Sequence, residues 1–142
     1  MTIWNDQNIS QLLQANNMWG QSYNHYFYGI KMPSVNMVGL VGVFAAVTMK
    51  LFIVNVSDTG LGIIGLNLMG DVEPTAIAHY DRQHIASMTV KTKWIALGMA
   101  DSVEITFSDG DVLKLQVNKW NATVKQQGAN LARLRRMQDP TT

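Results

Sequence analysis

The sequence predicts a mainly β protein with some α structure: an antiparallel arrangement of about seven strands with a helix before it and a helix after it. Residues 102–107 and 113–117 alternate apolar and polar side chains, which is the pattern of strands with one exposed face. Residues 108–111, Ser-Asp-Gly-Asp, supply a pair that tolerates positive φ and so predict a tight hairpin turn. From about Thr123 to Met137 the period lengthens to nearly four, which predicts a C-terminal helix.

At the N-terminus, residues 5–28 show a helical pattern of apolar and aromatic side chains. Asn5 or Asp6 can cap this helix, and Gly20 is expected to bend or divide it because Gly costs about 1 kcal/mol relative to Ala inside a helix. The stretch Lys31-Met-Pro-Ser then breaks the pattern. We therefore expect residues 1–34 to form an N-terminal helical extension and residues 35–142 to form a single structural unit.

Between these ends, β-branched residues and glycines predominate, and turn signals separate the apolar runs. A turn is expected at residues 57–60. The spacing Gly60-x-Gly62-x-x-Gly65 copies a dinucleotide-binding fingerprint, but no helix follows it, so we interpret these glycines as points where the sheet curves. The predicted strands are 38–48, 50–56, 61–68, a short one at 76–79, 85–91 and 93–98, besides the two of the hairpin.

Composition excludes several classes of protein. With 142 residues the chain has the size of one domain, and 47% hydrophobic with 15% charged residues is typical of a folded protein. The absence of cysteine excludes disulfides, thiolate metal sites and a Cys nucleophile. The first basic residue is Lys31, so we predict no signal peptide and a cytoplasmic protein. The apolar stretch 35–54 is interrupted by Gly, Thr and Lys, which favours buried strands over a membrane span.

The charge is distributed unevenly along the chain. Residues 1–81 carry two basic and five acidic side chains, or −3, whereas residues 82–142 carry nine basic and five acidic ones, or +4. In the C-terminal helix, Lys125, Arg133 and Arg136 fall outside the apolar stripe and could contact phosphates, anionic lipid headgroups or an acidic protein. The alternative is that they only complement the helix dipole. Nucleic acid is not favoured, because no Arg-Gly run or interleaved aromatics accompany these cations.

Aromatic residues are dense in the N-terminal segment, where Tyr23, Tyr26 and Phe27 lie close together. They must be buried against something, either the body of the same chain or a second molecule. Aromatic side chains are enriched at protein interfaces. The second alternative therefore predicts a protein partner or self-association through these residues.

The sequence offers little chemistry. His79, Asp81 and His84 are the only cluster with metal-ligand character, but their spacing matches no strong zinc pattern, so we interpret them as solvated polar residues. A hydrolase triad of His84 with Ser87 and Asp101 would lack a nucleophile elbow. We predict no catalytic residues, no metal and no cofactor, and no small-molecule substrate is identified.

Several of these segments resemble the bacterial pleckstrin-homology-like (PH-like) domain family. Residues 42–48, Gly-Val-Phe-Ala-Ala-Val-Thr, followed by 50–54, resemble its first paired strands. Residues 85–91, 103–107 and 113–117 resemble its later strands, and the helix 123–137 resembles the one that plugs its barrel. The resemblance covers about residues 36–138. It implies a PH-like antiparallel β-barrel of about seven strands capped by a C-terminal α-helix, in a family without assigned activity.

In eukaryotic PH domains, phosphoinositide recognition rests on several Lys and Arg residues around the first hairpin. The corresponding segment here offers only Lys50, so inositol-lipid binding is not expected. We predict a non-catalytic interaction or oligomerisation scaffold. The alternative is peripheral binding of an anionic lipid surface or an acidic partner through the basic C-terminal helix.

Overall fold

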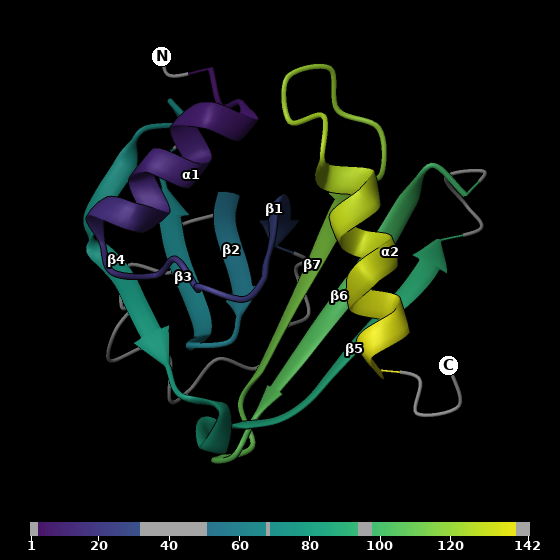
Figure 1. The fold of residues 1–142 in the computed structure, drawn as a ribbon. Coiled ribbons are helices and arrows are strands. Elements are labelled where there is room, and N and C mark those ends of the chain that lie inside the picture. The colour runs from purple at the N-terminus through teal and green to yellow at the C-terminus, as the bar shows by residue number, and fades with distance from the viewer. Residues whose placement is uncertain (1–2, 32–50, 68, 94–97, 139–142) are drawn as a thin grey trace.

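A computed structural model describes residues 3–31, 51–67, 69–93 and 98–138, with the side chains of residues 75 and 93 excepted. The described chain is mainly antiparallel β structure with a helix near each end, as predicted (Figure 1). The elements in chain order are α1 (Asp6–Ala15), β1 (Asn24–Lys31), β2 (Leu51–Ser57), β3 (Gly60–Leu66), β4 (Val72–Tyr80), the short 3-10 helix η2 (Arg82–His84), β5 (Ile85–Lys93), β6 (Ala100–Phe107), β7 (Val112–Asn118) and α2 (Gln127–Gln138).

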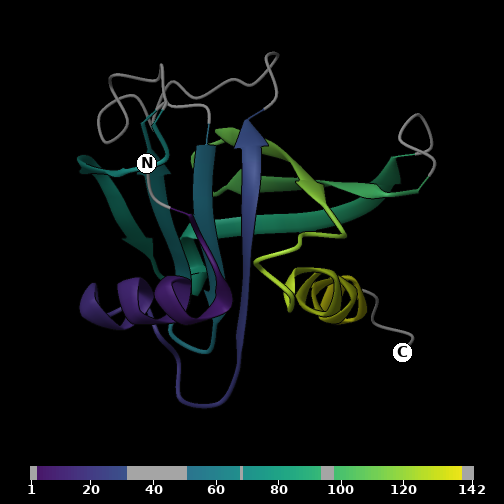
Figure 2. The same ribbon diagram turned by 90° about the horizontal axis from the view of Figure 1, so that it is seen from above.

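The strands form one sheet in the order β4-β3-β2-β1-β7-β6-β5, and every pair is antiparallel. This sheet is not closed, because within the described residues β4 pairs only with β3 and β5 pairs only with β6. A seven-stranded barrel is therefore not confirmed. The sheet instead bends into two limbs, a first limb of β4, β3, β2 and β1 and a second limb of β7, β6 and β5. Figure 2 shows β5 and β6 of the second limb crossing the direction of β1 and β2.

The bend lies between β1 and β7. These strands pair only at Ile30↔Gln116 and Lys31↔Leu115, whereas β1 pairs with β2 along its length from Asn24 to Ile30. The rest of β1 diverges from β7, and α2 lies over the opening that this divergence leaves (Figure 1). The location of α2 is thus decided by where the strand pairing stops.

Apolar residues are buried on both faces of β1, β2 and β3. On β2, Phe52 and Val54 face an inner cluster between the two limbs, and Ile53 faces an outer cluster under α1. Leu131 and Leu134 of α2 complete the inner cluster. Each such Leu, Ile or Phe stabilises the fold by about 1.5–3 kcal/mol when fully buried. Burial on both faces explains the almost continuous apolar sequence of β3, in which all seven residues are buried.

The predicted N-terminal helix is confirmed over α1 but is wrong for residues 16–23, which form no regular element, and for residues 24–28, which belong to β1. Asn17, with φ of 58°, follows the helix C-cap at Asn16 and turns the chain away. Gly20 then lies where an added Cβ would come within 2.7 Å of the Ser57 Cβ, so the chain can lie close to the end of β2 only because this residue is Gly. Residues 1–34 thus contribute both α1 and a central strand of the sheet.

The other elements agree well with the sequence pattern. Strands predicted at 50–56, 61–68, 85–91, 102–107 and 113–117 are confirmed as β2, β3, β5, β6 and β7, and the short strand at 76–79 extends to the whole of β4. The turns before Gly60 and around Gly110 are confirmed, with φ of 122° and 98° at these glycines. The predicted strand 38–48 and most of the predicted strand 93–98 lie outside the described residues. Neither described helix combines the length and the apolar character that crossing a bilayer requires.

Candidate site for an anionic partner on helix α2

Residues 119–138 carry five basic side chains and no acidic one. This stretch runs from the end of β7 through the connecting loop and along α2. The fold divides the five cations into two that are engaged with the sheet and three that are exposed. The contacts that hold α2 in place decide which cations are engaged and which are exposed.

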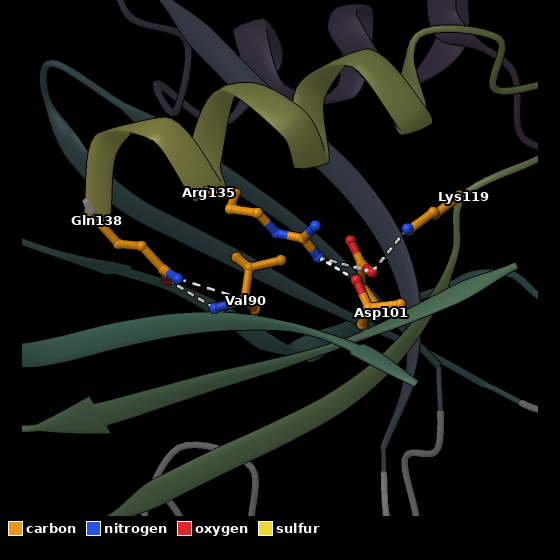
Figure 3. Close-up of polar contacts among 6 residues, drawn as sticks. Val90, Asp101, Lys119, Arg135 and Gln138 are labelled. Atoms are coloured by element: carbon orange, nitrogen blue, oxygen red, sulfur yellow. Dashed lines mark hydrogen bonds and ion pairs between the residues drawn. The ribbon is translucent and has the colours of Figure 1, made fainter. Parts of the chain in front are cut away.

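Asp101 on β6 engages two of the cations. Its side chain is 2% exposed and accepts a hydrogen bond of 3.0 Å from Arg135 Nη2, while Lys119 Nζ lies 3.4 Å away (Figure 3). Arg135 Nη2 also donates to Thr92 Oγ1 of β5 at 2.8 Å. A buried carboxylate is tolerated when it is paired and hydrogen-bonded. Arg135 therefore anchors α2 to the second limb of the sheet.

Two amide side chains anchor α2 where β1 and β7 diverge. Gln127 Oε1 accepts a hydrogen bond of 2.8 Å from the Tyr28 backbone N–H, and Gln127 Nε2 donates one of 2.7 Å to the Asn118 carbonyl. One side chain thus bridges two strands that no longer pair. Asn130 Nδ2 donates to the Tyr26 carbonyl at 2.9 Å. These bonds supply partners for backbone groups of β1 and β7 at positions where these two strands do not pair with each other.

A third amide fixes the end of the helix. Gln138 Oε1 accepts from the Val90 backbone N–H at 2.6 Å, and Gln138 Nε2 donates to the Val90 carbonyl at 3.2 Å (Figure 3). Val90 lies on β5, an edge strand of the described sheet. Gln138 therefore covers part of an edge that another strand could otherwise extend.

Asp6 of α1 holds the start of α2. Its carboxylate accepts hydrogen bonds from the backbone N–H groups of Lys125 at 2.7 Å and Gln126 at 3.2 Å, and from the Tyr26 hydroxyl at 2.6 Å. A negative charge at the start of a helix is favourable because it meets the positive end of the helix dipole. Burial, followed by the hydrogen bond and the charge of Asp6, raises the pKa of Tyr26. The two helices are therefore joined through one carboxylate.

The three remaining predicted cations, Lys125, Arg133 and Arg136, are exposed. Arg133 Nη1 donates to Asn130 Oδ1 at 3.1 Å, a bond within the helix. Since Leu131 and Leu134 are buried in the inner cluster, Arg133 and Arg136 lie on the side of α2 that faces solvent. Lys125 is exposed in the turn that precedes the helix.

Trp120, in the loop between β7 and α2, is 72% exposed. It lines a shallow hollow of about 360 Å³ together with Lys119 and Lys125. From the sequence, Trp120 is of interest with the other tryptophans as part of a surface, but it is not among the residues predicted to contact a partner. The signal available was its place between Lys119 and Asn121, directly after an alternating strand has ended. We call Trp120, Lys125, Arg133 and Arg136 the basic surface.

The aromatic residues predicted to contact a partner are mostly inside the molecule. Phe27 is 0% exposed in the inner cluster, and Tyr26 is 7% exposed in the outer cluster. Tyr23 is partly buried, with its ring stacked on His25 at 5.1 Å. Of the two alternatives, packing on the body of the same chain therefore describes Tyr26 and Phe27, because β1 is a central strand with both faces covered.

The residues with possible metal or catalytic chemistry are not assembled into a site. His79, Asp81 and His84 are exposed, and the described residues contain no group of three metal-ligating side chains. Ser87 pairs with Thr106, whereas Asp101 lies opposite Thr92, five residues further along β5. This separation is about 17 Å along a strand. Asp101 is moreover engaged by Arg135, so the triad does not form.

The comparisons with known proteins identify no relative: no family model, no curated protein and no solved structure matches this chain.

Proposed function

We propose that this is a non-catalytic protein that attaches to anionic membrane surfaces through its basic surface. The observation that carries the proposal is Trp120, which is 72% exposed beside Lys125 in a stretch of twenty residues, 119–138, without an acidic side chain. A Trp exposed to this degree just after the end of β7 would be unfavourable on a surface that meets only water. Its amphipathic ring is suited to the headgroup region of a bilayer.

The cations supply the attraction. A Lys or Arg close to an anionic bilayer contributes about 1 kcal/mol and acts over about one Debye length. Arg133 and Arg136 are exposed on α2 and Lys125 is exposed in the turn before it, and we expect all three to face the charged surface. The helix itself would stay outside the bilayer, because Leu131 and Leu134 are committed to the core. The attachment is therefore electrostatic, reversible and dependent on salt.

The same observations support a PH-like scaffold as the framework for this surface. Within the described residues, seven antiparallel strands are followed by a helix that packs over the open corner of the sheet. Oligomerisation is a separate proposal, and with Tyr26 and Phe27 buried it would need other residues than those two.

The test is co-sedimentation of the protein with vesicles of phosphatidylcholine alone and of phosphatidylcholine with phosphatidylglycerol, at low and high salt. The variant Arg133→Glu with Arg136→Glu should weaken binding to the anionic vesicles at least about thirtyfold, since two contributions of about 1 kcal/mol are lost. Trp120→Ser should weaken binding to them as well. Lys125→Glu should also weaken binding. Its matched control is Lys91→Glu, which reverses an exposed charge on β5, outside the basic surface, and should leave binding unchanged.

Binding confined to anionic vesicles, reduced by salt and by the variants of the basic surface but not by Lys91→Glu, would support the proposal. Equal binding to neutral vesicles, or unchanged binding by the double variant, would refute it. Binding to heparin or single-stranded DNA without binding to vesicles would assign the surface to a polyanion instead. Light scattering on the same preparation decides the alternative: a discrete oligomer that ignores vesicles would favour an assembly scaffold.

A further inference from the structure

An apolar groove lies at the end of α2 that is remote from Trp120. It consists of two adjoining hollows of about 220 and 240 Å³ that share Val56, Met88 and Met137 as walls. The first hollow extends along Leu134 to Gln138, and the second extends to Ile85, Tyr23 and Arg82. The groove therefore reaches from α2 to η2, which connects β4 with β5.

The floor of the groove lies at the edge of the inner cluster. Val56, Ile85 and Met88 are partly buried and pack against the inner cluster. Met137 is 50% exposed and forms the outer wall. Met side chains are unbranched and adapt to the shape of what they contact, so two of them make walls that suit a flexible apolar ligand.

One charged group stands at the rim. The guanidinium of Arg82 donates a hydrogen bond to the Tyr23 hydroxyl and lies 5.9 Å from the centre of the Tyr23 ring. Among the residues that the structure describes, no acidic one lines either hollow. Among the residues that the structure describes, Arg82 takes part in no ion pair, since the carboxylate found with cations is that of Asp101. Tyr23 thus orients a cation that forms no ion pair with any described carboxylate.

We propose that this groove binds a free medium-chain fatty acid, with the alkyl chain along Val56, Met88 and Met137 and the carboxylate on Arg82. A guanidinium offers a carboxylate two parallel hydrogen bonds, which fixes the orientation of the ligand. Each hollow is smaller than the roughly 300–1,000 Å³ of sites for drug-sized molecules, so a single unbranched chain fits better than a ring system. This site is separate from the basic surface, and neither proposal depends on the other.

The binding test uses protein labelled with ¹³C at the Met methyl groups and titrated with decanoate below its critical micelle concentration. Saturable shifts of the Met88 and Met137 signals, with the exposed Met69 and Met99 unchanged, are expected. Decanol has the same chain without the charge, and it should bind about tenfold more weakly because the Arg82 contact is lost. Arg82→Gln should reduce decanoate affinity by a similar factor and leave decanol affinity unchanged.

A variant pair separates loss of binding from loss of folding. Met137→Glu places a carboxylate at the groove wall and should abolish decanoate binding, whereas Met69→Glu makes the same change at a similarly exposed Met outside the groove and should not. Equal shifts at all exposed methionines, or equal affinities for decanoate and decanol, would overturn the proposal. It would also be overturned if phospholipid vesicles shifted Met88 and Met137 while decanoate did not.

Discussion

Asp101 and Arg135 form a hydrogen-bonded ion pair of 3.0 Å between β6 and α2, with the carboxylate 2% exposed and the guanidinium side chain 41% exposed (Figure 3). The pair is asymmetric, because the cation reaches water and the anion does not. Removing the cation therefore leaves a buried charge, whereas removing the anion releases a cation that can be hydrated. The only other cation near this carboxylate among the described residues is Lys119, at 3.4 Å.

Arg135→Met should therefore lower the free energy of unfolding by about 1–3 kcal/mol, less than for a fully buried pair because the arginine is partly solvated. The neighbouring Arg136→Met changes the same residue type at an exposed position and should change stability by less than about 0.5 kcal/mol. Urea denaturation followed by tryptophan fluorescence measures both. Equal effects of the two substitutions would show that Asp101 does not rely on Arg135.

Gln127→Ala should destabilise the protein by about 1–3 kcal/mol, because the Tyr28 N–H and the Asn118 carbonyl lose their shared partner. Gln126→Ala, one residue earlier and exposed, is the matched control and should be nearly neutral. Hydrogen exchange gives a second measurement, since protection of the Tyr28 amide should fall selectively in the first variant. A protected Tyr28 amide in Gln127→Ala would contradict the bridging role.

The protein should lose stability as the pH falls below about 6.5, the unfolded pKa of histidine. Burial first, then the positive charge of Arg133, lowers the pKa of His25 in the folded state, with a hydrogen bond to the Asn24 backbone opposing them. Since the unfolded chain binds a proton there more readily than the folded one, His25 contributes stability above the unfolded pKa, and this is lost as the pH falls toward the folded pKa.

The check is the urea midpoint at pH 7 and pH 5. His25→Gln should flatten the difference, and His79→Gln, which replaces an exposed histidine, should leave it unchanged. An identical pH dependence in wild-type protein and His25→Gln would rule out this origin.

Phe27→Ser should lower the free energy of unfolding by about 3–5 kcal/mol, because a fully buried aromatic ring is removed from the inner cluster. Tyr23→Ser, in the same segment but only partly buried, should cost much less. Circular dichroism and light scattering measure folding and mass together. A Phe27→Ser protein of native stability and reduced oligomer size would instead assign Phe27 to an interface between molecules.

Much of the fold is predictable from local patterns. Strands with alternating apolar and polar residues are predictable, as in β7 and residues 102–107 of β6, although the polar side of β6 is buried or half-buried. Gly60 and Gly110 mark turns because their positive φ excludes most other residues. β1 was not predictable in this way, because both of its faces are buried and the run His25-Tyr26-Phe27-Tyr28 carries no alternation. Because the strand shows no alternation, the sequence alone does not distinguish burial of Tyr26 and Phe27 in the same chain from contact with a partner.

The candidate site likewise contains residues that local patterns predict and residues that they do not. Lys125, Arg133 and Arg136 were found from their position outside the apolar stripe, which depends only on helical periodicity. The roles of the amides Gln127, Asn130 and Gln138 were not predictable, because each side chain forms a hydrogen bond with a backbone group that is distant in sequence. Those backbone groups lack a strand partner only because β1 diverges from β7 or because β5 is an edge strand.

The sequence by itself determined the mainly antiparallel β architecture, the α2 segment and its excess of positive charge, because these follow from periodicity and composition over neighbouring residues. The tertiary structure alone decided which of those charges face solvent, since Asp101 on β6 engages Arg135 and Lys119 while Lys125, Arg133 and Arg136 remain on the outside. It also placed Arg82 beside the groove and left Trp120 exposed in the loop after β7. These outcomes depend on contacts between residues far apart in the chain, which no local pattern records.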